Sequence, residues 1–205
     1  MTSSRFQELE KRIGELTEYF LPKSFDPIGL YDEIIYEQAR AFKVLAHAEF
    51  ESFIEDRVIE VVDGAVARWE KQGKISQALL AAVAYRELAP LIPASLNEAA
   101  TKREKFPTLK ARVQAARNDI NRYVRNQNHG IKEKNLLRML LPIGFSDDEI
   151  NPDWLAVTEA WATTRGDAAH KGAKMQVQID PQKELKTVNE VLQGFREIDS
   201  QMDLK

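Results

Sequence analysis

The chain has 205 residues, with 29 basic and 32 acidic side chains, three histidines, no cysteine and a net charge of −3. This length corresponds to one domain, and 43% hydrophobic residues supply enough apolar surface for a folded core. The lack of cysteine excludes disulfide scaffolds, thiolate metal sites and cysteine nucleophiles, and the slight acidity argues against a protein that coats nucleic acid through bulk charge.

Helical periodicity dominates the chain. Apolar residues recur at spacings of three and four, and they predict helices over residues 3–20, 30–69, 75–88, 109–125, 132–141, 153–161 and 181–200. The second helix is unusually long, with Gly64 as a candidate kink. Because no strand-like alternation competes over a useful length, the predicted fold class is an all-α helical bundle.

No targeting or membrane segment is recognisable in the sequence. Residues 1–12 lack the apolar stretch of a signal peptide, and no apolar run reaches the length of a membrane helix. We therefore expect a cytoplasmic protein without a membrane partner.

Positive charge is concentrated in residues 102–138, called the basic segment below. It holds eleven basic and three acidic side chains, a net charge of +8, which leaves −11 for the rest of the chain. One interpretation is a helical face paired with acidic neighbours, and an equally weighted one is a surface that follows a phosphate backbone. Under the second, the candidate RNA-binding residues are Arg117, Arg122, Arg125, Asn128, His129 and Lys132 of this segment, together with Lys171 further along the chain.

The three histidines differ in their surroundings. His47 lies inside a predicted helix, which is typical of a partly buried helical histidine, and His129 lies at a predicted helix C-terminus, where an imidazolium interacts favourably with the helix dipole. His170 follows Arg165 by five residues. An uninterrupted helix would turn these two side chains roughly 140° apart, so we expect the helix to break or restart at Gly166 and bring them into one pocket.

An arginine and a histidine suffice for metal-free RNA cleavage. The guanidinium stays charged and binds phosphate through its fixed fork, and the imidazole exchanges a proton near neutral pH. The base removes the ribose 2′-hydroxyl proton, the oxygen attacks phosphorus and the arginine stabilises the developing charge. Neither a phosphate-binding glycine loop nor metal-ligand spacing offers a competing site, and we expect no metal or cofactor.

The segment RGDAAH (165–170) matches the arginine–histidine motif of HEPN domains, and AHKG (169–172) resembles the ending of that motif. The segments at 46–58 and 128–145 also resemble HEPN proteins, the latter those of the RiboL-PSP type. The resemblance covers most of residues 30–175. It implies a single HEPN-like antiparallel bundle over 1–205, with flanking helices 3–20 and 181–200.

The resemblance also implies a function. Many HEPN proteins are metal-independent endoribonucleases of toxin–antitoxin or phage-defence systems, which pair as homodimers. It assigns Arg165 and His170 as catalytic. Gly166 occupies the usual polar position after the arginine, so either Asp167 substitutes as the polar catalytic residue or the geometry of the active site is altered. The expected partners are RNA, a second copy and a cognate antitoxin or defence-system protein. The alternatives are a non-catalytic HEPN-like module that binds RNA, a nucleotide or a protein, and a purely structural scaffold.

Three acidic residues are candidate partners of Arg165. Glu51, Glu55 and Asp56 lie in the long predicted helix and are candidates to orient the guanidinium through a salt bridge. A solvated helix face explains each of them equally well.

Overall fold

The computed structural model describes residues 2–86, 92–170 and 178–205, and for residues 166–170 it describes the helical backbone without the side chains. The chain forms two compact units. Unit 1 consists of Met1–Arg57, His129–Leu137 and Asp148–Leu204, and unit 2 consists of Val58–Asn128, Arg138–Asp147 and Lys205. Each unit is described by itself below.

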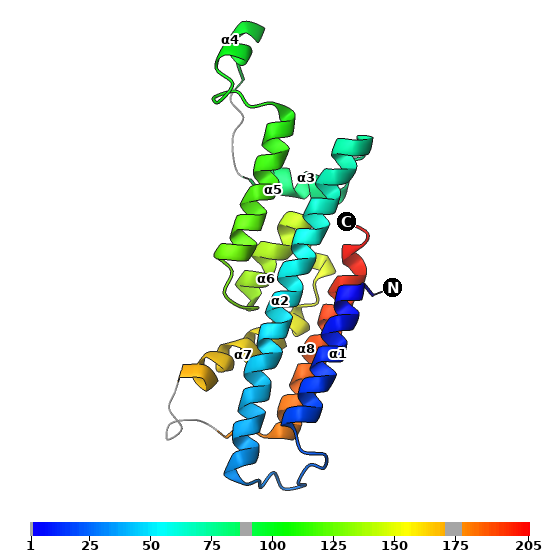
Figure 1. The fold of residues 1–205 in the computed structure, drawn as a ribbon, viewed down its shortest axis with the longest axis vertical. Helices are drawn as coiled ribbons and strands as arrows, with labels where there is room; N and C mark the ends of the chain where they lie inside the picture. The colour runs from blue at the N-terminus through cyan, green and yellow to red at the C-terminus, as the bar shows by residue number, and fades with distance from the viewer. Residues whose placement is uncertain (1, 87–91, 171–177) are drawn as a thin grey trace. The chain divides into compact units, whose positions relative to one another are not determined.

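The described residues contain helices and no strand (Figure 1), so the predicted all-α fold is confirmed. In chain order the elements are α1 Ser4–Phe20, α2 Glu33–Gln72, α3 Gln77–Ala84, α4 Leu96–Thr101, α5 Leu109–Asn126, α6 Glu133–Leu140, the 3₁₀ helices η1 Leu141–Ile143 and η2 Asp147–Glu149, α7 Pro152–His170 and α8 Pro181–Met202. No helix among these ranges is long and apolar enough to cross a membrane.

Side-chain caps explain where several helices begin. Ser3 accepts a hydrogen bond from the Phe6 backbone N–H at α1, and Thr108 does the same for Ala111 at α5. Pro181 occupies the first turn of α8, where its missing N–H has no cost. These starts agree with the sequence predictions, and α2 runs unbroken past Gly64.

The predicted helix break at Gly166 is wrong. α7 continues as one 19-residue helix from Pro152 to His170. A glycine inside a helix costs only about 1 kcal/mol relative to alanine, which a helix packed against its neighbours tolerates. A restart at Gly166 therefore does not bring the motif residues together.

Aromatic side chains from α2, α7 and α8 form the core of unit 1. The rings of Phe50 and Phe195 stack at a centroid distance of 5.1 Å, and Trp154 meets Phe195 edge-on at 5.2 Å. Gly194 makes this approach possible, because a Cβ there would lie 2.1 Å from the Trp154 ring. Trp154 and Trp161 are buried, as expected for core residues.

A buried ion-pair network ties α1 and α8 to α2 in unit 1. Asp199 is fully buried and accepts hydrogen bonds from Ser3 N at 2.7 Å, Ser3 Oγ at 2.8 Å and Arg57 Nε at 2.7 Å. A second carboxylate, that of Asp203, accepts from Arg57 Nη2 at 2.9 Å. Figure 1 shows α1 and α8 side by side, as these contacts require.

Unit 2 is built on α3, α5 and η1. α3 packs against both of the other elements. The side-chain amide of Gln77 donates to the Gly144 carbonyl at 2.6 Å. Gly144 has a φ of +95° and closes η1 directly against Gln77, so glycine is required there both for its backbone conformation and for lack of space.

Candidate active site

The position of Arg165 is fixed by Trp161, one turn earlier in α7. The Trp161 ring lies 5.8 Å from that of His47 and 5.7 Å from that of Phe50, both on α2. The Trp161 indole N–H donates to Glu184 Oε1 at 2.5 Å, and Lys43 Nζ lies 3.1 Å from the other oxygen of Glu184. This contact network holds the end of α7 against α2 and α8 in unit 1.

Arg165 carries a buried polar atom that makes no hydrogen bond to the described residues. Its Nε is shielded from solvent and donates no hydrogen bond within the described part of the chain. Buried donors are almost always paired, because an unpaired one costs free energy. The guanidinium is always charged, and its charge acts on His47 and Glu51 of α2.

His47 is the second buried group of the site. Its side chain is 3% exposed, and Nδ1 has no hydrogen-bond partner among the described residues. Burial lowers the pKa of His47 to about 4, and the positive charges of Arg165 and Lys43 act in the same direction. At neutral pH the imidazole therefore carries no charge.

Glu51 lies one helical turn beyond His47, with its Oε2 3.8 Å from His47 Nδ1. Burial and the negative charge of Glu55 raise the pKa of Glu51, while the charge of Arg165 and the backbone N–H of Gly130 act against the rise. The Gly130 N–H donates to this carboxylate. Gly130 has a φ of +132°, and a Cβ there would lie 3.8 Å from the His47 ring.

Arg165, His47 and Glu51 thus form one polar cluster, called the Arg165 cluster below, in which His47 is buried and the other two are half-buried. A neutral imidazole, a carboxyl group with a raised pKa and a guanidinium with an unused donor lie together in unit 1. Perturbed titratable groups of this kind gather at functional sites. The guanidinium is suited to bind an oxyanion such as phosphate.

The other acidic candidates have different roles. Asp56 accepts a hydrogen bond from Arg5 Nε at 3.1 Å, and Glu55 acts on Glu51 as a like charge. The third candidate, Glu51, has a pKa on which the charge of Arg165 acts.

Several predicted site residues cannot be placed. The side chains of Asp167 and His170, and the whole of Lys171, lie outside the described residues. Their catalytic and RNA-binding roles stay predictions.

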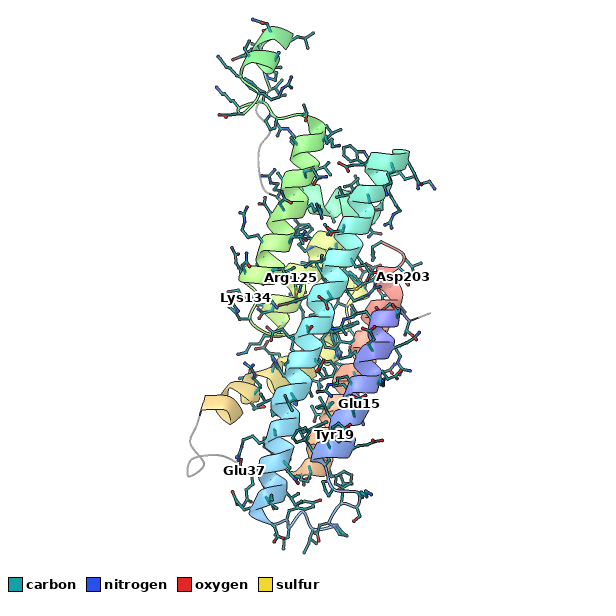
Figure 2. All side chains as sticks on the ribbon, in the orientation of Figure 1. Glu15, Tyr19, Glu37, Arg125, Lys134 and Asp203 are labelled. Carbon is teal, nitrogen blue, oxygen red and sulfur yellow. The ribbon has the colours of Figure 1, made fainter. Side chains whose placement is uncertain are left out.

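In unit 2, several basic side chains of the basic segment form ion pairs with acidic neighbours. Arg117 donates to both oxygens of Asp63 at 2.6 and 3.0 Å, and this contact lowers the pKa of Asp63 and raises that of Arg117. The exposed side chain of Arg122 lies 3.6 Å from Asp119. The paired-surface interpretation therefore describes these residues, and Arg125 adds an exposed cation (Figure 2).

In unit 1, the basic segment reaches the Arg165 cluster. His129 is exposed and precedes Gly130, and its charge acts on Glu51. Lys132 and Lys134 follow as exposed cations, with Lys134 on α6 (Figure 2). Asn128, which belongs to unit 2, is buried at 4% exposure, a position that favours a structural role over contact with RNA.

Sequence reasoning missed His47 as a member of the site. The missed signal is a row of polar residues at helical spacing along the otherwise apolar face of α2, formed by Arg40, Lys43, His47 and Glu51. Arg40, Lys43 and His47 are buried. A buried polar row on one helix face indicates a site.

Comparison with known protein families gives a match over almost the whole chain. The family model described as RiboL-PSP-HEPN matches residues 7–203. HEPN domains are helical, as is the described part of this chain. The chain belongs to the RiboL-PSP-HEPN family, as the sequence resemblance indicated. No curated protein and no solved structure matches it.

Proposed function

We propose that this protein is a metal-independent endoribonuclease of the HEPN type. The observation that carries the proposal is the buried Nε of Arg165, which has no hydrogen-bond partner among the described residues and lies beside a neutral His47. A protein leaves such a donor unpaired at a cost in stability, and a substrate phosphate would satisfy it. Family membership supports the same assignment.

The proposed chemistry uses Arg165 and His170. The His170 imidazole takes the proton of a ribose 2′-hydroxyl, and the 2′-oxygen attacks the adjacent phosphorus. Arg165 stabilises the negative charge that develops on the phosphoryl oxygens. The bond from phosphorus to the 5′-oxygen breaks and that oxygen is protonated, so the products carry a 2′,3′-cyclic phosphate and a 5′-hydroxyl.

The proposed assembly is a homodimer. Two copies would supply two Arg165–His170 sets to one cleft, so one imidazole acts as base while the other, protonated, acts as acid. Asp167 would be the polar residue that replaces the one usually found at position 166. His129, Lys132 and Lys171 would guide the RNA backbone toward the cluster through its phosphates.

The proposed biological setting is that of a toxin or phage-defence effector, restrained by an antitoxin or a defence-system partner. This setting follows from the family's general role and from the enzymatic proposal above. It is tested by the neighbouring gene, whose product should bind this chain and suppress its cleavage of RNA.

The enzymatic proposal is tested by incubating RNA with the protein in EDTA. Wild type should cleave, and Arg165→Ala and His170→Ala should each lower the rate about 100-fold or more. The termini of the products are then identified. Cleavage that requires a divalent metal, or that survives both substitutions, contradicts the mechanism. RNA binding without turnover, unchanged in His170→Ala, would instead support the non-catalytic module, which Gly166 at the usual polar position favours.

A further inference from the structure

Trp161 is the anchor of the α7 segment that carries the arginine–histidine motif. Trp161 and Ala162 are buried, whereas the two threonines that follow are exposed and Arg165 is half-buried. Threonine and Gly166 also favour a helix less than most residues do. The place of Arg165 therefore depends on how firmly Trp161 is held, one turn earlier in the same continuous helix.

Glu184 of α8 holds the Trp161 side chain in place. Its Oε1 accepts the hydrogen bond from the Trp161 indole N–H at 2.5 Å, and its Oε2 accepts from Lys43 Nζ on α2 at 3.1 Å. All three side chains are buried, and Lys43 Nζ lies 5.4 Å from the centroid of the Trp161 ring. One carboxylate thus links α7, α8 and α2 at the last buried turn before Arg165.

Stability alone does not explain a buried ion pair at this place. Taking Glu184 and Lys43 out of water costs free energy that their attraction offsets only in part, so well-packed apolar residues are often at least as stable. What the carboxylate adds is direction. A hydrogen bond has a preferred angle, so the bond to the indole N–H fixes the rotation of the Trp161 ring, which apolar packing alone does not do.

We infer that Glu184 is a positioning residue for Arg165, which acts through Trp161. The inference rests on the proposed function, and it adds that the guanidinium meets the phosphate correctly only while the hydrogen bond between Glu184 and Trp161 fixes the end of α7. Neither Glu184 nor Trp161 touches the RNA in this account. Because Arg165 stabilises charge in the transition state, its displacement should lower kcat and leave the binding of RNA nearly unchanged.

The first test is the variant Glu184→Gln, which keeps the volume of the side chain. One carboxylate oxygen becomes an amide group that cannot accept from the Trp161 N–H or from Lys43, so one of the two contacts is lost. We expect kcat to fall about tenfold or more. The Kd for a 2′-O-methyl oligonucleotide, which cannot be cleaved and is titrated by fluorescence anisotropy, should stay within about twofold of wild type, because exposed cations bind the phosphates. An unchanged kcat overturns the inference.

Asp199→Asn is the matched control. Asp199 lies on α8, as Glu184 does, but about 22 Å further along the helix, and its pair with Arg57 is at least as deeply buried as that of Glu184 with Lys43. Both substitutions leave a buried cation incompletely compensated and should lower the melting temperature. At a temperature where circular dichroism shows both variants folded, kcat should fall in Glu184→Gln and stay within about twofold of wild type in Asp199→Asn. Equal losses of kcat would show a general effect of stability and overturn the inference.

Two double variants test the route through Trp161 to Arg165. Lys43→Met added to Glu184→Gln removes the buried cation, so the glutamine oxygen is free to accept from the Trp161 N–H, and most of the lost kcat should return. Glu184→Gln added to Arg165→Ala should lower kcat no further than Arg165→Ala alone, because the group that Glu184 positions is gone. Failure of the rescue, or independent losses in the second pair, overturns the inference.

Amide hydrogen exchange separates this inference from the proposed function, because it does not require activity. The part of α7 after Trp161 should exchange about tenfold faster in Glu184→Gln than in wild type, and at nearly the wild-type rate in Asp199→Asn. If wild type does not cleave RNA but this difference is seen, the proposed function fails while the restraint of Glu184 on the segment of Arg165 is supported. If wild type cleaves and Glu184→Gln leaves the exchange of α7 unchanged, only the inference fails.

Discussion

Two arginines of unit 1, Arg57 and Arg165, have opposite surroundings. Arg57 is 2% exposed and is paired with Asp199 and Asp203, so its charge holds α1, α2 and α8 together. Arg165 has a buried Nε without a partner in the described residues, beside a neutral histidine. The comparison shows one cation matched by carboxylates that serves the fold, and a second, Arg165, that we propose to be available to a ligand.

The largest effect is expected where the structural cluster is broken. Asp199→Asn leaves the Arg57 charge buried and incompletely compensated, which should cost about 3–5 kcal/mol of unfolding free energy. Urea unfolding measures this. Asp203→Asn is the control, because the Asp203 side chain is 56% exposed and should cost about 1 kcal/mol or less. Equal losses would show that Asp199 is not the centre of the cluster.

The Arg165 cluster should make the stability of the folded chain depend on pH. The pKa of His47 is about 4 in the folded chain against 6.5 for an ordinary histidine, so the unfolded chain binds the extra proton between these values. Stability should therefore fall as pH drops from 6.5 to 4, by up to about 3 kcal/mol from this group, and be unaffected by it above 6.5.

The contribution of His47 to this pH dependence is measured by comparing the unfolding free energies of wild type and His47→Leu over the same pH range. The difference in unfolding free energy between the two proteins should grow toward pH 4, because only wild type has an imidazole to protonate. Lys43, Glu51 and Arg165 are the charged groups around the ring, and they are the same in both proteins. Parallel curves would contradict a buried neutral histidine.

A smaller effect is expected from the exposed cations of unit 1. Lys132→Ala and Lys134→Ala should each weaken binding of the 2′-O-methyl oligonucleotide a few-fold and reduce the slope of log K against log salt by about 0.7. Anisotropy titrations at several salt concentrations measure both quantities. An unchanged salt slope in both variants would show that these lysines do not contact the RNA phosphates.

The smallest effect is expected at Arg117, which resembles Arg57 in being paired but lies nearer the solvent. Arg117→Ala should lower stability by about 1 kcal/mol or less, because the pair with Asp63 is about one-third exposed. The RNA cleavage rate of Arg117→Ala should stay within about twofold of the wild-type rate. A large loss of cleavage would instead support the sequence-based assignment of Arg117 to the RNA interface.

Sequence reasoning predicted the elements that local chemistry determines. The caps at Ser3 and Thr108 and the proline that opens α8 are set by neighbouring residues, and the apolar periodicity fixed the fold class. The long-range pairs were not predicted: Arg57 meets Asp199 across 142 positions, and nothing local to either residue indicates the other.

The candidate site was predicted only around its motif. Arg165 was singled out by RGDAAH, but the contact of His47 with Trp161 depends on packing between α2 and α7, which no single segment encodes. Gly166 was misread because glycine propensity is a weak signal that helix packing overrides. The net charge of the basic segment follows from the sequence alone. The pairing of Arg117 with Asp63, which offsets part of that charge, is visible only in the folded structure.

The central claim is that Arg165, and not the paired arginines, serves RNA cleavage. The most direct measurement is the single-turnover cleavage rate in EDTA for wild type, Arg165→Ala and Arg117→Ala, each shown by circular dichroism to be folded. We predict a loss of about 100-fold or more for Arg165→Ala and near wild-type rates for Arg117→Ala. Equal rates in Arg165→Ala and wild type, or equal losses in the two variants, would contradict the account.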